Sequence, residues 1–264
     1  MVEPVLAQIW ASDIALASRV EDASLNASAP PQQHWLDGWL VRYSPGKAKR
    51  ARSINAVAQG RMSVPEKLRL AEPIYRQAGL ELMVRITPFS QPEGLDAMLA
   101  AMGLNVLDDT RVMISGHLQA LPATPLPAGC RWEPTDHNRF AQVVGQLRGS
   151  PEDHCAAHAQ RLLASPVPYQ GWLVYSNDSQ DILGCAQIAI EADMAGLYDV
   201  FTAPAARGRG IAAALCAHLL RCAATQGASV AYLQVDSDNI AARKVYQQLG
   251  FADAYSYHYR VASE

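Results

Sequence analysis

The sequence predicts a mixed α/β protein made of two similar halves, and three observations support this fold class. Short apolar runs rich in β-branched and aromatic residues alternate with amphipathic runs that have apolar residues at helical spacing. The same order of landmarks occurs twice along the chain. A segment rich in proline and alanine, Leu121 to Gly129, separates the two occurrences. We therefore expect an N-terminal domain over residues 1–120, a linker over 121–129 and a C-terminal domain over 130–264.

The N-terminal half begins with residues Val5 to Glu21, whose apolar positions fall near helical spacing and predict a helix. After a polar, proline-bearing loop, the pattern predicts strand, strand, helix, strand, helix and strand. These elements are expected at Trp35–Tyr43, Arg52–Val57, Pro65–Gly79, Glu81–Thr87, Leu95–Met102 and Arg111–Leu118.

The C-terminal half has a more distinctive run. Residues Leu197 to Thr202 predict a strand, and the basic loop Arg207-Gly208-Arg209-Gly210 follows. A long helix is expected from Ile211 to a stop at Gly227, then a strand over Val230 to Val235 and a helix that ends at Gly250.

A strand, a glycine loop and a helix in this order favour phosphate binding. The first turn of a helix has unpaired N–H groups and partial positive charge, and glycines let the backbone approach an anion. Arg207 and Arg209 add cationic donors suited to phosphate oxygens. The alternative is an ordinary helix start preceded by a basic turn.

Three landmarks support an internal duplication. Both halves contain the same three features in the same order. The first is a Gly-Trp-Leu-Val tetrapeptide, the second is a helix-ending glycine before a strand, and the third is a helix-ending glycine inside an apolar triplet. They are 38–41 and 171–174, Gly79 and Gly227, and 102–104 and 249–251.

Two motifs carry a resemblance to a known family. The loop Arg207-Gly208-Arg209-Gly210-Ile211-Ala212 matches the Q/R-x-x-G-x-G/A pyrophosphate loop of the GNAT acetyltransferase superfamily. The pattern N-x-x-A-x-x-x-Y-x-x-L-G-F, from Asn239 through Tyr246 to Phe251, resembles the GNAT C-terminal motif. The resemblance covers roughly Arg131 to Arg260. It implies two GNAT-like lobes, each a mixed, mostly antiparallel sheet flanked by helices with a splayed strand pair.

The resemblance implies an N-acetyltransferase that uses acetyl-CoA as cosubstrate, without a metal, and moves the acetyl group to a primary amine by direct attack on the thioester. The acceptor would be a small molecule or a peptide or protein amine. The implied cofactor-binding residues are Val200, Phe201, Thr202, Arg207, Gly208, Arg209, Gly210, Ile211, Ala212 and Asn239.

The same resemblance assigns the proton transfers. Tyr246 would protonate the leaving thiolate, and Asp199 would take the proton of the amine, with Asp236 as a second candidate. An amide of Val200 or Phe201 would polarise the thioester carbonyl. The alternatives are a packing role for Tyr246 and an ordinary strand-end carboxylate at Asp199. Asn239 is also explained as a helix N-cap.

The N-terminal half departs from the family pattern. No R-x-x-G-x-G lies between Ser53 and Lys67, so this half is expected to be degenerate and not to bind acetyl-CoA. It has a stretch without Asp or Glu, residues 38–65, that suits either an acidic ligand or a solvated hairpin face. The cations of this stretch are Arg42, Lys47, Lys49, Arg50, Arg52 and Arg61.

Two further groups lie in the C-terminal half. His154 and His158 share a helix face and suit a metal, but no third ligand follows at a telling distance, which favours surface histidines. Tyr257 and Tyr259, on the expected final strand, are candidates to line the acceptor cleft.

Composition bounds the remaining classes. The chain has 264 residues and a formal net charge of −3, which gives no case for nucleic acid. No apolar run is long enough to span a membrane, no basic leader opens the chain, and the five cysteines form no C-x-x-C pair, so we expect a cytoplasmic protein. A homodimer stays open. The rival functions are a non-catalytic acyl-CoA-binding regulator and a nucleic-acid-binding module that uses the basic stretch.

Overall fold

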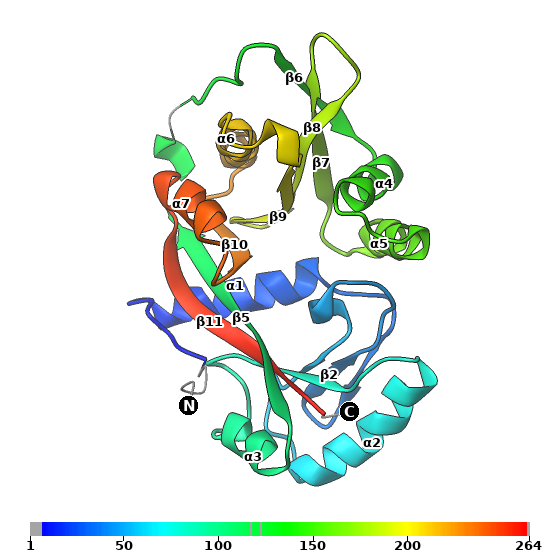
Figure 1. Ribbon diagram of the computed structural model, residues 1–264. Coiled ribbons are helices and arrows are strands. Elements are labelled where there is room, and N and C mark those ends of the chain that lie inside the picture. The colour runs from blue at the N-terminus through cyan, green and yellow to red at the C-terminus, as the bar shows by residue number, and fades with distance from the viewer. Residues whose placement is uncertain (1–6, 117, 122, 263–264) are drawn as a thin grey trace.

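The computed structural model describes residues 7–116, 118–121 and 123–262, and within them one 11-stranded sheet runs through the molecule (Figure 1). The strand order is β1-β2-β3-β4-β11-β5-β10-β9-β8-β7-β6. The strands are β1 (Gln33–Leu36), β2 (Trp39–Arg42), β3 (Ile54–Asn55), β4 (Met83–Ile86), β5 (Asn105–Ser115), β6 (Cys130–Thr135), β7 (Tyr169–Ser176), β8 (Ile182–Glu191), β9 (Met194–Thr202), β10 (Val230–Asp236) and β11 (Ala252–Val261).

Helices flank both halves of this sheet. The α-helices are α1 (Ile14–Ala27), α2 (Val64–Gln77), α3 (Leu95–Ala101), α4 (His137–Leu147), α5 (Glu152–Ala164), α6 (Ile211–Thr225) and α7 (Ile240–Gln248). The short 3-10 helices are η1 (Lys49–Ala51), η2 (Leu118–Ala120) and η3 (Pro204–Ala206). The β3–β4 and β9–β10 pairs are parallel, whereas the other neighbouring strands pair antiparallel. The predicted mixed, mostly antiparallel α/β class is confirmed.

Each half places its last strand in the sheet of the other half. Strand β11 pairs with β4 in the N-terminal half, and β5 pairs with β10 in the C-terminal half. The two exchanged strands also pair with each other, from Ala252 opposite Ile114 to Val261 opposite Asn105, and lie side by side in the middle of the molecule (Figure 1). The two halves therefore share one continuous sheet. The division of the chain into two domains joined by a linker at residues 121–129 stays a prediction.

The order of elements repeats in the two halves and supports the expected duplication. The run β1 to β5 has the same sequence of strands and helices as the run β7 to β11. Gly79 and Gly227 end equivalent helices with positive φ, as Gly103 and Gly250 do. The shared tetrapeptide is different, because residues 38–41 open β2 whereas residues 171–174 lie inside β7, the counterpart of β1. That identity does not mark equivalent positions.

The N-terminal elements differ from the expectation in two places. Part of the expected helix over residues 5–21 lies outside the described residues, and α1 begins only at Ile14, where the Asp13 side chain accepts a hydrogen bond from the Leu16 amide at 2.9 Å. The segment expected as one strand, residues 35–43, is a hairpin. Asp37 and Gly38 both have positive φ there and reverse the chain between β1 and β2.

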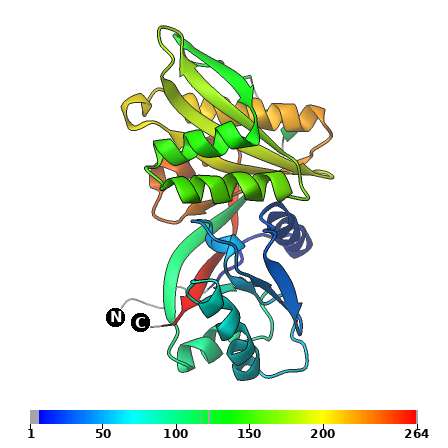
Figure 2. The ribbon, with the colours of Figure 1, turned by 90° about the vertical axis from the view of Figure 1, so that its right-hand side faces the viewer.

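The C-terminal half has three layers. Helices α4 and α5 lie side by side over one face of the sheet, and α6 covers the opposite face (Figure 2). Alternation along β7 explains this arrangement, since Leu173 packs with Phe140 of α4 and the adjacent Val174 packs in the cluster that contains Leu219 of α6. Helix α1 crosses the middle of the molecule and packs near Tyr198 of β9.

Candidate active site

The parallel strands β9 and β10 separate part of the way along their length. Their pairing extends from Met194 opposite Val230 to Leu197 opposite Leu233. Beyond this point β9 continues against β8, and β10 continues against β5. This is the splayed strand pair expected for the C-terminal half. A cavity of about 320 Å³ lies at the separation. Its lining includes Asp199, Val200, Asn239 and Tyr246.

A β-bulge places Asp199 at this separation. Cys185 of β8 lies opposite Phe201, but Gln187 lies opposite Tyr198, so β9 has one extra residue between them. Asp199 takes a positive φ of 49°, which is uncommon for a residue with a side chain. A bulge leaves the extra residue outside the regular ladder and redirects its side chain, so Asp199 lies toward α4 and α5.

The carboxylate of Asp199 is held by three side chains from different elements. Arg148 donates from Nη1 at 2.7 Å, Gln187 donates from Nε2 at 2.7 Å, and His158 Nε2 lies 3.3 Å away. Burial by itself raises the pKa of Asp199, but the hydrogen bond with His158 and the charge of Arg148 outweigh burial and lower it far below the ordinary value. Asp199 is therefore ionised across the physiological range and is a weak proton acceptor.

Tyr246 reaches the same cavity from α7. Its side chain is 7% exposed and packs edge-on against Phe251, with 6.2 Å between ring centroids. Burial raises its pKa well above that of a free tyrosine, so the hydroxyl keeps its proton at neutral pH. Asn239 caps the same helix by accepting a hydrogen bond from the Ala242 amide at 3.2 Å. The expected N-cap is confirmed.

The glycine loop opens α6 as the pattern predicts. Gly208 and Gly210 both have φ of +78°, and Gly210 is the N-cap residue. Within the described chain no side chain caps this end of α6. The loop is anchored by Ile211, which is buried, and by Arg207, whose Nε donates to the Thr202 carbonyl at 3.4 Å. Arg209 donates to Cys130 Sγ at 3.3 Å.

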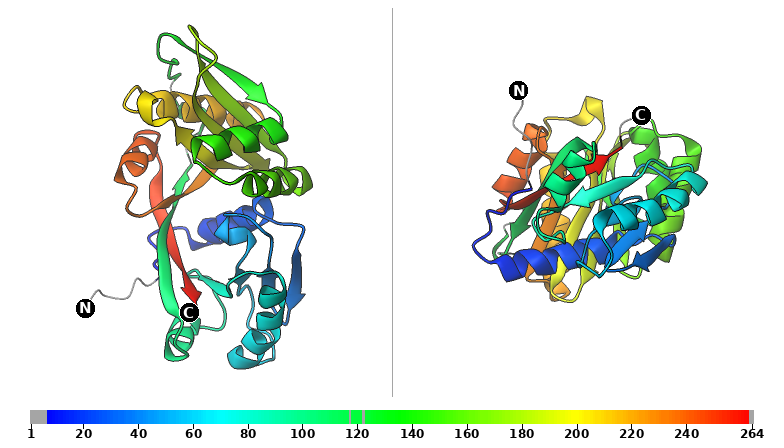
Figure 3. Two further views of the ribbon diagram at one scale, coloured as in Figure 1. Left: turned by 45° about the vertical axis from the view of Figure 1, so that its right-hand side comes forward. Right: turned by 90° about the horizontal axis from the view of Figure 1, so that it is seen from below.

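A second, larger cavity of about 450 Å³ adjoins the first and lies between the two halves. Asp199, Arg50, Arg148, His158 and Arg161 line both cavities. The N-terminal half contributes Lys47 to Arg50, and β11 contributes Tyr257 and Tyr259. That these tyrosines line an acceptor cleft stays a prediction. We call the two cavities together the interlobe cleft. In the ribbon views of Figure 3, α5 lies opposite the segment around η1.

Sequence reasoning missed the side chains that α4 and α5 add to the cleft. His154 and His158 both line it, and His158 is only 13% exposed, so the expectation of surface histidines is wrong for His158. The i, i+3 and i+4 spacing of His154, His158 and Arg161 put them on one helix face and was the available signal. Among residues 7–116, 118–121 and 123–262 no cluster of His, Cys, Asp or Glu suits a metal ion.

The equivalent loop of the N-terminal half is occupied by the protein itself. The Asp37 carboxylate accepts hydrogen bonds from the Met62 amide at 2.7 Å and from the Arg61 amide at 2.8 Å. The Ser63 amide donates to Glu66 at 2.9 Å, and residue 65 is proline and has no N–H. Aligned on the N-cap residues of α2 and α6, positions 62, 63 and 65 correspond to 209, 210 and 212. The first two amides bind side chains of the protein itself, and the third position has no amide N–H.

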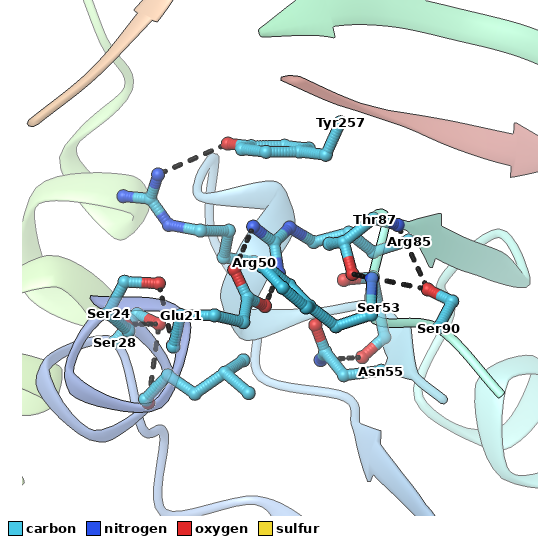
Figure 4. A network of polar contacts seen from close by, with 12 residues as sticks. Glu21, Ser24, Ser28, Arg50, Ser53, Asn55, Arg85, Thr87, Ser90 and Tyr257 are labelled. Atoms are coloured by element: carbon cyan, nitrogen blue, oxygen red, sulfur yellow. Dashed lines mark hydrogen bonds and ion pairs between the residues drawn. The ribbon is translucent and has the colours of Figure 1, made fainter. Parts of the chain in front are cut away.

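The strand separation in this half has a smaller cavity, of about 250 Å³, whose lining includes a buried ion pair. Arg85 of β4 forms a buried ion pair with Glu21 of α1, as Figure 4 shows. The Gln91 amide donates to the Ala56 carbonyl at 2.8 Å and joins the segments that follow β4 and β3. Glu21, Ala56, Arg85 and Gln91 all line this smaller cavity, and the two contacts link its walls.

Comparisons with known proteins give a family match and similar folds. Residues 135–251 match the acetyltransferase (GNAT) family. The chain is 27% identical over 232 residues to the uncharacterized N-acetyltransferase YobR of Bacillus subtilis (strain 168), over 87% of this chain and 92% of that protein. No helix in the described part of the chain is long and apolar enough to cross a membrane.

Two solved structures share the fold. A GCN5-related N-acetyltransferase from Kribbella flavida superposes with a TM-score of 0.66 at 15% identity and covers 96% of this chain and 97% of its own. A tandem GNAT protein from the clavulanic acid biosynthesis pathway has a TM-score of 0.63 at 15% identity and covers 75% of this chain and 69% of its own.

Proposed function

Residues 135–251 belong to the GNAT acetyltransferase family, and from this premise we propose that the chain transfers an acetyl group from acetyl-CoA to a primary amine. The observation that carries the proposal is the convergence of Asp199, His158 and Tyr246 on one cavity at the separation of β9 and β10. An open strand separation there offers backbone groups and side chains to a thioester from two sides.

The α6 loop is the proposed pyrophosphate site. The uncapped first turn of α6 and the positive-φ glycines Gly208 and Gly210 offer amide donors to an anion at a helix N-terminus. Arg207 and Arg209 are exposed beside these amides and add charge. Val200, Phe201 and Thr202 form the strand along which the pantetheine arm would lie, and an amide at Val200 or Phe201 would polarise the thioester carbonyl.

The proton of the amine is proposed to leave through His158. Asp199 is too strongly stabilised as a carboxylate to be an effective base, because an effective base has a pKa near the working pH. Its contact with His158 Nε2 at 3.3 Å instead orients the ring and stabilises the imidazolium that forms. Asp199 thus becomes a positioning residue, and His158 takes the role that the sequence assigned to Asp199.

Tyr246 is proposed to protonate the thiolate of coenzyme A. Its raised pKa means that the hydroxyl is protonated at neutral pH, so a proton is available to the thiolate as it leaves. Asn239 is proposed to contact the cofactor arm from the start of α7. The N-terminal half is proposed to be degenerate, since its loop amides are taken by Asp37 and Glu66.

A calorimetric titration with acetyl-CoA tests the proposal, with Gly210→Trp as the control that blocks the α6 loop. We expect binding of one acetyl-CoA per chain in the wild type and its loss in the control. The rival regulator would also bind acetyl-CoA, so release of the free thiol in the presence of amines is measured next. Binding without release of thiol by any amine would favour the regulator, and no binding at all would contradict both functions.

A further inference from the structure

The interlobe cleft has an excess of positive charge although the protein as a whole is acidic. Its lining holds five cations and three carboxylates, while the chain carries a formal net charge of −3. The cations are Lys47, Lys49, Arg50, Arg148 and Arg161, and the carboxylates are Asp108, Asp199 and Asp236.

Two of the three carboxylates are already neutralised inside the cleft. Lys49 Nζ lies 2.6 Å from Asp108, and Arg148 Nη1 lies 2.7 Å from Asp199. The third, Asp236, is exposed at the end of β10 and accepts a hydrogen bond from the Asp238 amide. Lys47, Arg50 and Arg161 are therefore left without an ion-pair partner within the described residues.

Arg161 is the clearest case. It is partly buried on α5, and in the part of the chain that the structure describes its guanidinium makes neither a hydrogen bond nor an ion pair. Burial lowers its pKa, and the charge of Arg50 acts in the same direction against the attraction of Asp199. Charges that leave water are normally paired, so an unpaired guanidinium that lines a cavity is suited to bind an anion there.

Arg50 faces the same space from the N-terminal half. Its guanidinium donates to the neutral oxygen Gln234 Oε1. It also donates to Tyr257 Oη at 3.3 Å (Figure 4). Its Nε is buried and has no hydrogen-bond partner among the described residues, and the same holds for Gln234 Nε2. Arg50, Gln234 and Arg161 thus line one cavity together with Asp199.

We propose that the acceptor is an amine that carries a carboxylate or a phosphate, and that Arg161 and Arg50 bind this anionic group in the interlobe cleft. Arginine suits both groups because its planar fork matches their oxygen pairs. A simple alkylamine is cationic at neutral pH and is repelled by the cleft, whereas an anionic group on the same molecule offsets that repulsion. The inference rests on the proposed function, because it names the substrate class of the same site.

Matched probe pairs test the proposal by calorimetry, with the wild-type protein both free and saturated with coenzyme A. One pair is propylamine and β-alanine, which differ by a carboxylate. The other is ethanolamine and phosphoethanolamine, which differ by a phosphate. In at least one pair, we expect the member that carries the anionic group to bind at least about tenfold more tightly than the member that lacks it. The probe pair with the larger ratio of dissociation constants shows whether the site prefers a carboxylate or a phosphate.

The variant Arg161→Gln should remove this preference, and Arg161→Lys should keep part of it, because it retains the charge without the fork. Arg76→Gln on α2 is the matched control, since Arg76 is 74% exposed and lies outside the cleft. Equal binding of both members in both pairs, or an unchanged preference in a folded Arg161→Gln protein, would overturn the proposal. Acetyl-CoA binding in the same preparation tests the proposed function separately, since the free-protein titrations do not depend on it.

Discussion

Replacing Tyr246 by phenylalanine gives the sharpest test of the proposed chemistry. The change removes one hydroxyl and keeps the ring, which stays packed against Phe251 at 6.2 Å. The hydroxyl makes no hydrogen bond to any described residue, so the free energy of unfolding should change by less than about 0.5 kcal/mol. A positioned general acid contributes roughly 10²- to 10⁴-fold to rate, which corresponds to about 3 to 5 kcal/mol of transition-state stabilisation.

The assay follows release of the coenzyme A thiol at saturating acetyl-CoA and amine, together with calorimetric affinity for acetyl-CoA. We expect kcat of Tyr246→Phe to fall by at least about 10²-fold with nearly unchanged acetyl-CoA affinity. Tyr175→Phe is the matched control, because Tyr175 lies on β7 beneath Arg131 and outside the cleft. Because burial raises the pKa of Tyr246, any alkaline loss of activity caused by its ionisation should lie above the ordinary tyrosine value of about 10. A kcat within about threefold of wild type would refute the acid role.

Three further changes have defined outcomes. Asp199→Asn keeps the size of the side chain but removes the charge that orients His158, so kcat should fall by roughly 10²-fold in the thiol-release assay. An unchanged kcat would argue against a catalytic role for the Asp199–His158 pair. Burial raises the pKa of Asp96, but hydrogen bonds with His258 and Arg260 outweigh burial and lower this pKa to about 2. The contact therefore stabilises the fold above about pH 4, and ~2 kcal/mol of this stabilisation is lost as the pH falls toward 2. Urea unfolding at about pH 5 and about pH 3 should show a smaller difference in Asp96→Asn than in wild type, and an equal difference would contradict the assignment. Asp37→Ala should lower the melting temperature, because it leaves two loop amides and the buried Lys67 without their partner. The titration of this variant should still give one acetyl-CoA per chain. A second binding site would mean that Asp37 alone blocks the N-terminal half.

The features that the sequence predicted well depend on short-range physics. Gly208 and Gly210 sit at positive φ before α6, and Asn239 caps α7 three residues before its hydrogen-bonded amide. Backbone sterics and helix capping act within one or two turns, so these residues are readable from their neighbours alone. Predicted boundaries were less accurate at the hairpin of residues 35–43, because a turn that is closed by cross-strand pairing has a weak local signal there.

The sequence by itself determined the α/β class, the glycine loop at the start of α6 and the helix that carries Tyr246. Only the tertiary structure decided that β5 and β11 exchange places and that Asp199 meets Arg148, which is 51 residues away in the chain. It also brought Arg50 of the N-terminal half to a cleft that α5 lines with His158 and Arg161. Strand pairing and charge pairing over such separations depend on sheet register and on helix packing against both faces. Neither the sheet register nor the helix packing can be predicted from the residues next to any one of these positions.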